Sequence, residues 1–209
     1  MCARALIVGV TGNVGSGKTS FCHHLADAGI VVIFADAVAK AQLHEEDVLS
    51  RLKARWGEGV IDDQGRANRK AIAEIIFYDP AERHFLNSIV HPMTLKAFQD
   101  MIVSSRSKVL VFEVPLLFEA GLEDCFDFIV LVHTTPKLQL KRLLERDGSD
   151  REHLKKLIAS QMPDAQKINR VDLDIANIHG IEALETAANT FIRSIPNLPK
   201  KSIKPFFQV

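Results

Sequence analysis

The sequence predicts an α/β fold of three layers, in which helices cover both faces of a five-stranded parallel sheet. Short apolar runs rich in β-branched residues alternate with longer segments of helical period, which is typical of a parallel sheet. The first four runs are almost wholly apolar, as strands buried on both faces are. The predicted strands are 6–10, 30–34, 109–114, 128–132 and a weaker candidate at 173–177.

The gap between the second and third strands is too long for one crossover helix. It holds helical patterns interrupted by "WGEGVIDDQGRANR", "YDP" and "HP". We therefore expect a single domain over 1–209, with a core of about 1–37 and 108–209 and an inserted helical lobe of about 38–107. The tail from Pro196 on is expected to be irregular, with solvated lysines; a phosphate-binding role for them is the alternative.

Composition excludes several classes of function. Lys+Arg and Asp+Glu both number 26, so there is no global charge to attract nucleic acid or a membrane surface. Cys2, Cys22 and Cys125 are scattered without a CxxC pair, which favours reduced thiols over disulfides or zinc. No apolar run reaches the length of a membrane span, and the stretch before the first glycines is short for a signal peptide. The expectation is a cytoplasmic protein.

A glycine-rich loop follows the first predicted strand and precedes a helical pattern. Its letters "GNVGSGKT" satisfy G-x-x-x-x-G-K-[ST], a phosphate-binding loop in which backbone N–H groups and a helix N-terminus face the anion. Lys18 is expected to reach the β- and γ-phosphates, and the Thr19 hydroxyl to bind Mg²⁺. The alternative is a chance match in a glycine-rich turn. The predicted ATP-binding residues of the loop are Gly12, Asn13, Val14, Gly15, Ser16, Gly17, Lys18, Thr19 and Ser20.

The rest of the chain favours a kinase of a small molecule among the proteins with such a loop. A guanine-nucleotide switch would need an NKxD segment, which the sequence lacks, and "DDQG" at 62–65 lies in the inserted lobe, where it is expected to be a turn. A motor would normally be larger.

Carboxylates at the ends of two predicted strands lie where open α/β sheets bind ligands. Asp36 follows the second strand and could accept the proton of an attacking hydroxyl, or could equally cap the next helix. Glu113 ends the third strand, a position suited to a contact with Mg²⁺ or its water. Glu119 is either a further polar contact or a surface residue.

A basic helix face follows the fourth strand. Arg142 and Arg146 are four residues apart with Gln139 one turn earlier, so they share a face that suits a lid over transferring phosphate. The alternative is an exposed helix in which Glu145 and Asp147 balance the arginines.

Taken together, these segments resemble the dephospho-CoA kinases over nearly the whole chain. The loop "GVTGNVGSGKTSF" resembles that family's phosphate loop, "VVIFADAVAK" its acceptor-side segment with Asp36, and "PLLFEAG" at 115–121 a distinctive family motif. The segment "NRKAIAEIIFYDPAERHFLNSIVHP" is similar to the inserted CoA-binding lobe, and "QLKRLLERDGSDREHLKKLIASQM" to the lid and the helix after it. Matching positions in these two segments are Arg69, Phe77, Leu86, Asn87, His91, Pro92, Gln139, Arg142, Arg146 and Gln161.

The resemblance implies a P-loop kinase fold with a lid at about 138–165, and transfer of the ATP γ-phosphoryl group to the 3′-hydroxyl of dephospho-CoA. It implies catalytic roles for Lys18, Asp36 and Arg142, and further ATP contacts from Arg142, Arg146 and Asn177. The implied substrate-binding residues are Asp36, Arg69, Phe77, Leu86, His91, Pro115, Leu116, Leu117 and Glu119; a structural role for His91 is the alternative. The implied co-substrate and metal are ATP and Mg²⁺, in a monomer or small homo-oligomer with no nucleic-acid or membrane partner.

Three positions depart from the family pattern. Phe34 replaces the first Asp of the family's acceptor-side segment, and Glu113 replaces the usual Asp before "PLLFE". Asn177 matches a family position only with a one-residue slip.

The rival hypotheses are a kinase of another small acceptor, such as a nucleoside or nucleotide, and a nucleotide-binding switch that transfers no phosphate.

Overall fold

The structure is a computed structural model that describes residues 4–147 and 150–207. The chain forms two compact units, each described by itself below. One comprises 1–34 with 105–205, and the other comprises 35–104 together with the segment from Phe206 on. Among the described residues, no helix combines the length and apolarity needed to cross a membrane.

The first unit contains a fully parallel sheet in the order β2-β3-β1-β4-β5, which confirms the predicted α/β class and all five strands. Leu6 pairs with Val109 and Val8 with Phe128, so the central strand β1 has both neighbours from much later in the chain. The strands are β1 (Leu6–Thr11), β2 (Val31–Phe34), β3 (Val109–Glu113), β4 (Phe128–His133) and β5 (Leu173–Ala176). The two edge strands are the less buried ones, which explains the weaker apolar signal of β5.

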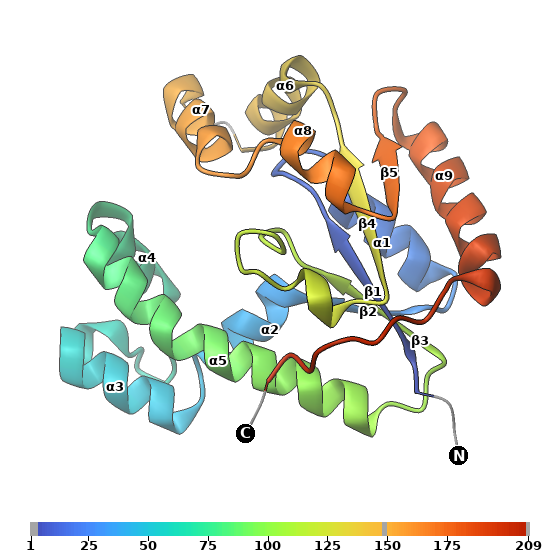
Figure 1. The fold of residues 1–209 in the computed structure, drawn as a ribbon. Coiled ribbons are helices and arrows are strands. Elements are labelled where there is room, and N and C mark those ends of the chain that lie inside the picture. The colour runs from blue at the N-terminus through green and yellow to red at the C-terminus, as the bar shows by residue number, and fades with distance from the viewer. Residues whose placement is uncertain (1–3, 148–149, 208–209) are drawn as a thin grey trace. The chain divides into compact units, whose positions relative to one another are not determined.

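Two helices cover one face of this sheet. Helix α1 (Lys18–Asp27, blue) and helix α9 (Ile181–Ser194, red) lie side by side there (Figure 1). Phe21 of α1 and Phe191 of α9 meet with ring centroids 5.9 Å apart, over the valines of β1, β3 and β4. This large buried apolar layer holds α1, the helix that follows the phosphate loop, against the sheet.

The opposite face is covered by the connection between β3 and β4, which contains the 3-10 helix η2 (Glu123–Cys125). Leu117 and Phe126 pack over Gly9 of β1. The helices after β4 are α6 (Pro136–Asp147), α7 (Arg151–Ala159), α8 (Asp164–Lys167) and the 3-10 helix η3 (Ile168–Arg170). They span the predicted lid, of which residues 148–149 lie outside the described part.

The tail has only one short 3-10 helix, η4 (Ile195–Asn197), and is otherwise irregular as predicted. Its lysines lie at the surface, where Lys201 pairs with Asp172 at 2.7 Å and Lys204 with Asp124 at 2.6 Å. Cys22 and Cys125 are buried free thiols, as expected; Cys2 lies outside the described residues.

The second unit is helical around its own apolar core. Its helices are α2 (Ala35–Gln42), α3 (Glu46–Trp56), the 3-10 helix η1 (Glu58–Val60), α4 (Arg69–Tyr78) and α5 (Pro80–Ser104). The "DDQG" segment is a turn, as predicted, because one Asp62 oxygen accepts the backbone N–H groups of Gln64 and Arg66. The expected break at "HP" is wrong, since α5 continues through Pro92. Pro92 removes the hydrogen bond to the carbonyl of Ser88, and Ser88 is exposed, so water can satisfy it.

Candidate active site

The phosphate loop lies where the chain changes direction in the sheet. From β1 the chain runs to β2 at one edge, whereas from β3 it crosses to β4 on the other side of β1. The carboxyl ends of β1 and β3 are therefore adjacent, with Val10 opposite Glu113. Open α/β sheets bind ligands at such a point, because the loops diverge and leave a crevice.

Two glycines of the loop are required by close approach and by backbone conformation. A Cβ at Gly12 would lie 2.1 Å from the carbonyl oxygen of Val132, and one at Gly17 would lie 2.2 Å from Nδ2 of Asn177. Gly17 also has a φ of 98°, which L side chains rarely adopt. The loop is thus closely packed on the ends of β4 and β5.

Only part of the loop backbone is open to a ligand. The N–H of Val14 donates to Oε1 of Gln161 at 2.9 Å, and the N–H of Ser16 donates to the carbonyl of Asn13 at 3.1 Å. Within the described residues, the N–H groups of Gly15, Gly17 and Thr19 have no such acceptor. The open donors therefore gather at the start of α1, where the helix dipole adds partial positive charge.

A hydroxyl, an ammonium and a carboxylate meet beside these donors. Thr19 Oγ1 donates to Oε1 of Glu113 at 2.7 Å, and Nζ of Lys18 lies 4.0 Å from the same oxygen. Lys18 and Glu113 are both buried, at 8% and 6% exposure. Burial, followed by the charge of Glu113, raises the pKa of the Cys22 thiol behind them. Hydroxyl and carboxylate oxygens are ligands that Mg²⁺ prefers.

Helix α6 contacts the loop through the face that its spacing predicts. Gln139 Nε2 donates to the carbonyl of Val14 at 2.7 Å, and Arg142 donates to the carbonyls of Ser16 at 3.4 Å and Asn177 at 3.1 Å. Arg146, one turn further, is exposed. Arg142 therefore places positive charge directly beside the loop.

Asn177 lies beneath the loop and is 6% exposed. Its Nδ2 donates to the carbonyl of Ser16 at 2.8 Å, and its Oδ1 accepts from Arg142 at 3.3 Å. Its own carbonyl accepts the hydroxyl of Thr134 at 2.8 Å. Both polar atoms of this buried side chain bond within the protein, and Nδ2 supports the loop backbone at Ser16.

A buried lysine beside the loop was missed by sequence reasoning. Lys167 is 0% exposed; its Nζ donates to Oδ1 of Asn13 at 2.8 Å and pairs with Oε1 of Glu119 at 3.1 Å. Partial burial raises the pKa of Glu119, but hydrogen bonds from the Met162 N–H and Lys167 outweigh this and lower it. No local signal marks Lys167, because "DAQKINR" reads as a surface helix.

The "PLLFE" motif divides into exposed and buried positions. Leu116 is 46% exposed, and Pro115 offers its carbonyl to Thr11 Oγ1 at 3.3 Å. The expectation that Leu117 contacts substrate is wrong for its side chain, which is fully buried over β1. At position 117 the motif residue therefore packs against the sheet.

The second unit carries the remaining predicted substrate residues. Asp36 is exposed within the first turn of α2, so the alternative that it caps the helix from outside is wrong. Phe77 is 53% exposed and meets the ring of Tyr78 edge-on at 4.9 Å. Leu86 is 8% exposed and packs in the unit's apolar core, and its substrate contact stays a prediction. Arg69 and His91 are exposed.

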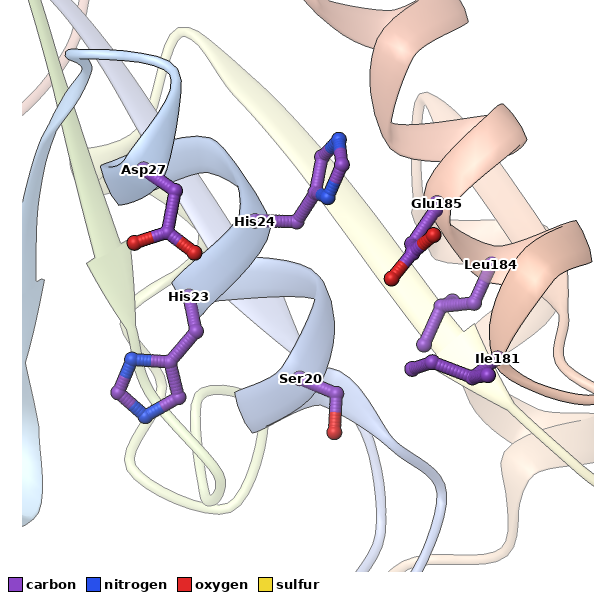
Figure 2. A pocket seen from close by; sticks show the side chains of 7 residues that line it. All are labelled: Ser20, His23, His24, Asp27, Ile181, Leu184 and Glu185. Carbon is purple, nitrogen blue, oxygen red and sulfur yellow. The ribbon is translucent and has the colours of Figure 1, made fainter.

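A separate groove of about 270 Å³ lies between α1 and α9 (Figure 2). His24 and Glu185 point into the space between the helices, whereas His23 points away and packs on Phe34 with ring centroids 5.0 Å apart. Ser20, near the N-terminal end of α1, also lines this groove. Among the described residues, no three His, Cys, Asp or Glu side chains are arranged to hold a metal ion.

Comparison with known proteins gives consistent matches. A family model described as dephospho-CoA kinase matches residues 6–183. The dephospho-CoA kinase of Fusobacterium nucleatum is 33% identical over 190 residues, which are 91% of this chain and 98% of that protein. The dephospho-CoA kinase of Geobacillus kaustophilus is 35% identical over 176 residues, 82% of this chain and 88% of that protein.

Solved structures agree with the sheet topology. TT1252 from Thermus thermophilus superposes with a TM-score of 0.78 at 30% identity, covering 92% of this chain and 99% of that one. Shikimate kinase from Acinetobacter baumannii has a TM-score of 0.53 at 15% identity, covering 92% of this chain and 94% of that one, and so shares the fold alone. The predicted kinase fold is thereby confirmed.

Proposed function

The chain belongs to the dephospho-CoA kinase family, and we propose that it performs that family's reaction with the phosphate loop and the residues around it. The γ-phosphoryl group of ATP is transferred to the 3′-hydroxyl of dephospho-CoA, giving ADP and coenzyme A. The observation that carries this proposal is the meeting of Lys18, Thr19 and Glu113 beside the open N–H groups of the loop.

In this proposal the loop and two cations stabilise the transferred charge. The N–H groups of Gly15, Gly17 and Thr19 receive phosphate oxygens, and Lys18 offsets the negative charge that develops on the β–γ bridging oxygen as its bond to phosphorus breaks. Arg142 is already held against the loop by two carbonyls, and a guanidinium has five N–H donors, so others remain for phosphate.

The residues present fit a magnesium ion. Thr19 Oγ1 would be a direct ligand and Glu113 would hold a metal-bound water, which suits an ion that keeps several waters. Bound there, Mg²⁺ neutralises charge on the phosphates during transfer. The longer Glu113 side chain reaches Thr19 at 2.7 Å, so it serves in place of the family's Asp.

Asp36 is proposed to orient the 3′-hydroxyl and accept its proton as oxygen attacks the γ-phosphorus. Its exposure in α2 leaves the carboxylate accessible to a substrate. Phe34, which replaces the family's other Asp, packs on His23, so one carboxylate remains for this task. Asp36→Asn is expected to lower kcat with little change in stability; near-wild-type kcat would remove the role.

The acceptor is proposed to bind through exposed residues of the second unit and the exposed part of "PLLFE". These are Arg69, Phe77, His91 and Leu116, together with Pro115, which is only partly exposed. We further propose that the protein acts in the cytoplasm, as a monomer or small homo-oligomer, without a nucleic-acid or membrane partner. The balance of 26 basic and 26 acidic residues supports the absence of a nucleic-acid or membrane partner.

The test is an ADP-release assay with ATP and Mg²⁺ in which dephospho-CoA, adenosine and AMP are offered in turn. Turnover with dephospho-CoA alone, with the new phosphate on the 3′-oxygen, is the expected result. Turnover only with adenosine or AMP would make the protein a kinase of another acceptor. ADP release at the same rate with and without each acceptor would favour a nucleotide-hydrolysing switch.

A further inference from the structure

A closed ring of contacts joins the phosphate loop to the segment after α7. Lys167 Nζ donates to Oδ1 of Asn13 at 2.8 Å and pairs with Oε1 of Glu119 at 3.1 Å. The same Glu119 oxygen accepts the backbone N–H of Met162 at 2.8 Å, and the carbonyl of Met162 accepts from Nδ2 of Asn13 at 3.1 Å. Each of the four residues contacts two of the others.

The ring fixes the orientation of one carboxamide completely. Asn13 accepts at Oδ1 from a cation and donates at Nδ2 to a carbonyl, so a rotation of its side chain would break both bonds. The carbonyl of Asn13 in turn accepts the N–H of Ser16, which closes the turn inside the loop. The next residue, Val14, is held on both sides by Gln161 and Gln139. The first half of the loop is thus clamped, while the second half presents open donors.

Burial makes Lys167 an unusual choice for mere packing. Its side chain is 0% exposed, and an ammonium withdrawn from water is costly unless it is well paired. An apolar residue of similar length would fill the same volume without that cost. A charge retained at such a site suits a task that needs a strong donor aimed at one acceptor.

We propose that Lys167 is a positioning residue for the phosphate loop. Acting through Asn13, it holds the turn that directs the N–H groups of Gly15 and Gly17 toward the phosphates of ATP. The inference rests on the proposed function only in that the loop binds ATP. It assigns no contact between Lys167 and the nucleotide.

The test compares Lys167→Met with a matched control, Lys155→Met, which removes an exposed lysine paired with Glu152 on α7. Calorimetry gives the Kd of Mg·ATP, thermal unfolding gives Tm, and steady-state kinetics give KM for dephospho-CoA. Lys167→Met is expected to weaken Mg·ATP binding about tenfold or more, with KM for dephospho-CoA changed by less than about twofold. Lys155→Met is expected to leave all three unchanged.

Two further variants separate positioning from folding. Glu119→Gln with Lys167→Met removes both charges, so no unpaired carboxylate remains; it is expected to regain Tm but to keep the weakened Mg·ATP binding. In an Asn13→Ala background, Lys167→Met is expected to add less than about twofold, because the route through Asn13 is already broken.

The opposite outcomes would overturn the inference. A lower Tm with an unchanged Kd in the folded protein would leave Lys167 a purely structural residue. A full effect in the Asn13→Ala background would mean that Lys167 acts on the nucleotide by another route. If the unmodified protein binds Mg·ATP but does not phosphorylate dephospho-CoA, the proposed function fails while the Kd comparison still decides the role of Lys167.

Discussion

Asn177 offers a sharp test of how the site is held together. Its buried carboxamide donates to the carbonyl of Ser16 at 2.8 Å and accepts from Arg142 at 3.3 Å. Asn177→Ala removes both bonds and leaves a small void beneath the loop. We expect the change to loosen the loop backbone without touching the base of the nucleotide.

The magnitude follows from these contacts. The lost hydrogen bond to Ser16 costs about 1 kcal/mol, and the void with the weaker Arg142 contact costs about 1 kcal/mol more. The sum is about 2 kcal/mol in the free energy of unfolding, which lowers Tm by about 4–8 °C in a chain of this size. Because the side chain is buried and both of its polar atoms already bond within the protein, we expect no contact with adenine, and the KM values for ATP and GTP should rise by the same factor.

The assay is thermal unfolding together with steady-state kinetics on both nucleotides at saturating dephospho-CoA. Gly17→Ala supplies a second measurement, because its Cβ would meet Asn177 Nδ2 at 2.2 Å but Leu184 only at 3.5 Å. In the Asn177→Ala background it should therefore cost only the strain of its φ, about 1–2 kcal/mol. A loss confined to ATP, or strictly additive costs of the two substitutions, would refute the reasoning.

Three further predictions concern charge and thiols in the first unit. Glu113→Gln should lower kcat about tenfold or more and raise the Mg²⁺ concentration needed for half-maximal activity, since it removes the carboxylate beside the proposed metal ligand. Asp127→Asn should destabilise the protein near neutral pH. Burial raises the pKa of Asp127, but hydrogen bonds from a guanidinium and two backbone N–H groups outweigh this and lower it. In a Cys2→Ser variant, a thiol reagent should modify neither Cys22 nor Cys125 before unfolding, because burial raises the pKa of both thiols.

Each of these has an outcome that would contradict it. An unchanged Mg²⁺ dependence in Glu113→Gln would place the metal elsewhere. Because the pKa of Asp127 is lowered on folding, its contribution is present above the ordinary carboxyl value of about 4 and is lost as pH falls through the folded value. Denaturant unfolding should therefore show the deficit of Asp127→Asn shrinking below about pH 4; a constant deficit would be inconsistent. Rapid labelling of native Cys22 would mean that α1 opens readily.

The parts of the site that lie close together in the sequence could be predicted from it. The loop, Lys18 and Thr19 follow from spacing between a strand and a helix, and Gln139 with Arg142 follows from helical period. Lys167 could not be found in this way, because it reaches Asn13 across 154 positions. Such a contact arises from tertiary packing, which a local sequence pattern does not encode.

Matching to a family motif named buried residues as substrate contacts, whereas local patterns had named too few residues. It named Leu117 and Leu86 together with their exposed neighbours, although one side chain lies over β1 and the other in the helical core. A motif records which residue is needed and not which way it points. The helix through Pro92 was missed because a proline commonly ends a helix, through its missing N–H and the clash of its ring with an earlier carbonyl, whereas α5 continues past it.

The order of the strands also determines when the first unit can assemble. Strand β1 is made first, yet its neighbours β3 and β4 begin at residues 109 and 128. The carboxylate of Asp127 accepts the N–H of Ile7 at the start of the chain and the N–H of Lys201 near its far end, both within 2.8 Å. A chain leaving the ribosome must therefore carry β1 unpaired while the helices of 35–104, whose contacts are local, are free to form. During synthesis, the phosphate loop therefore emerges before the strands that flank it and can acquire its shape only after they have followed.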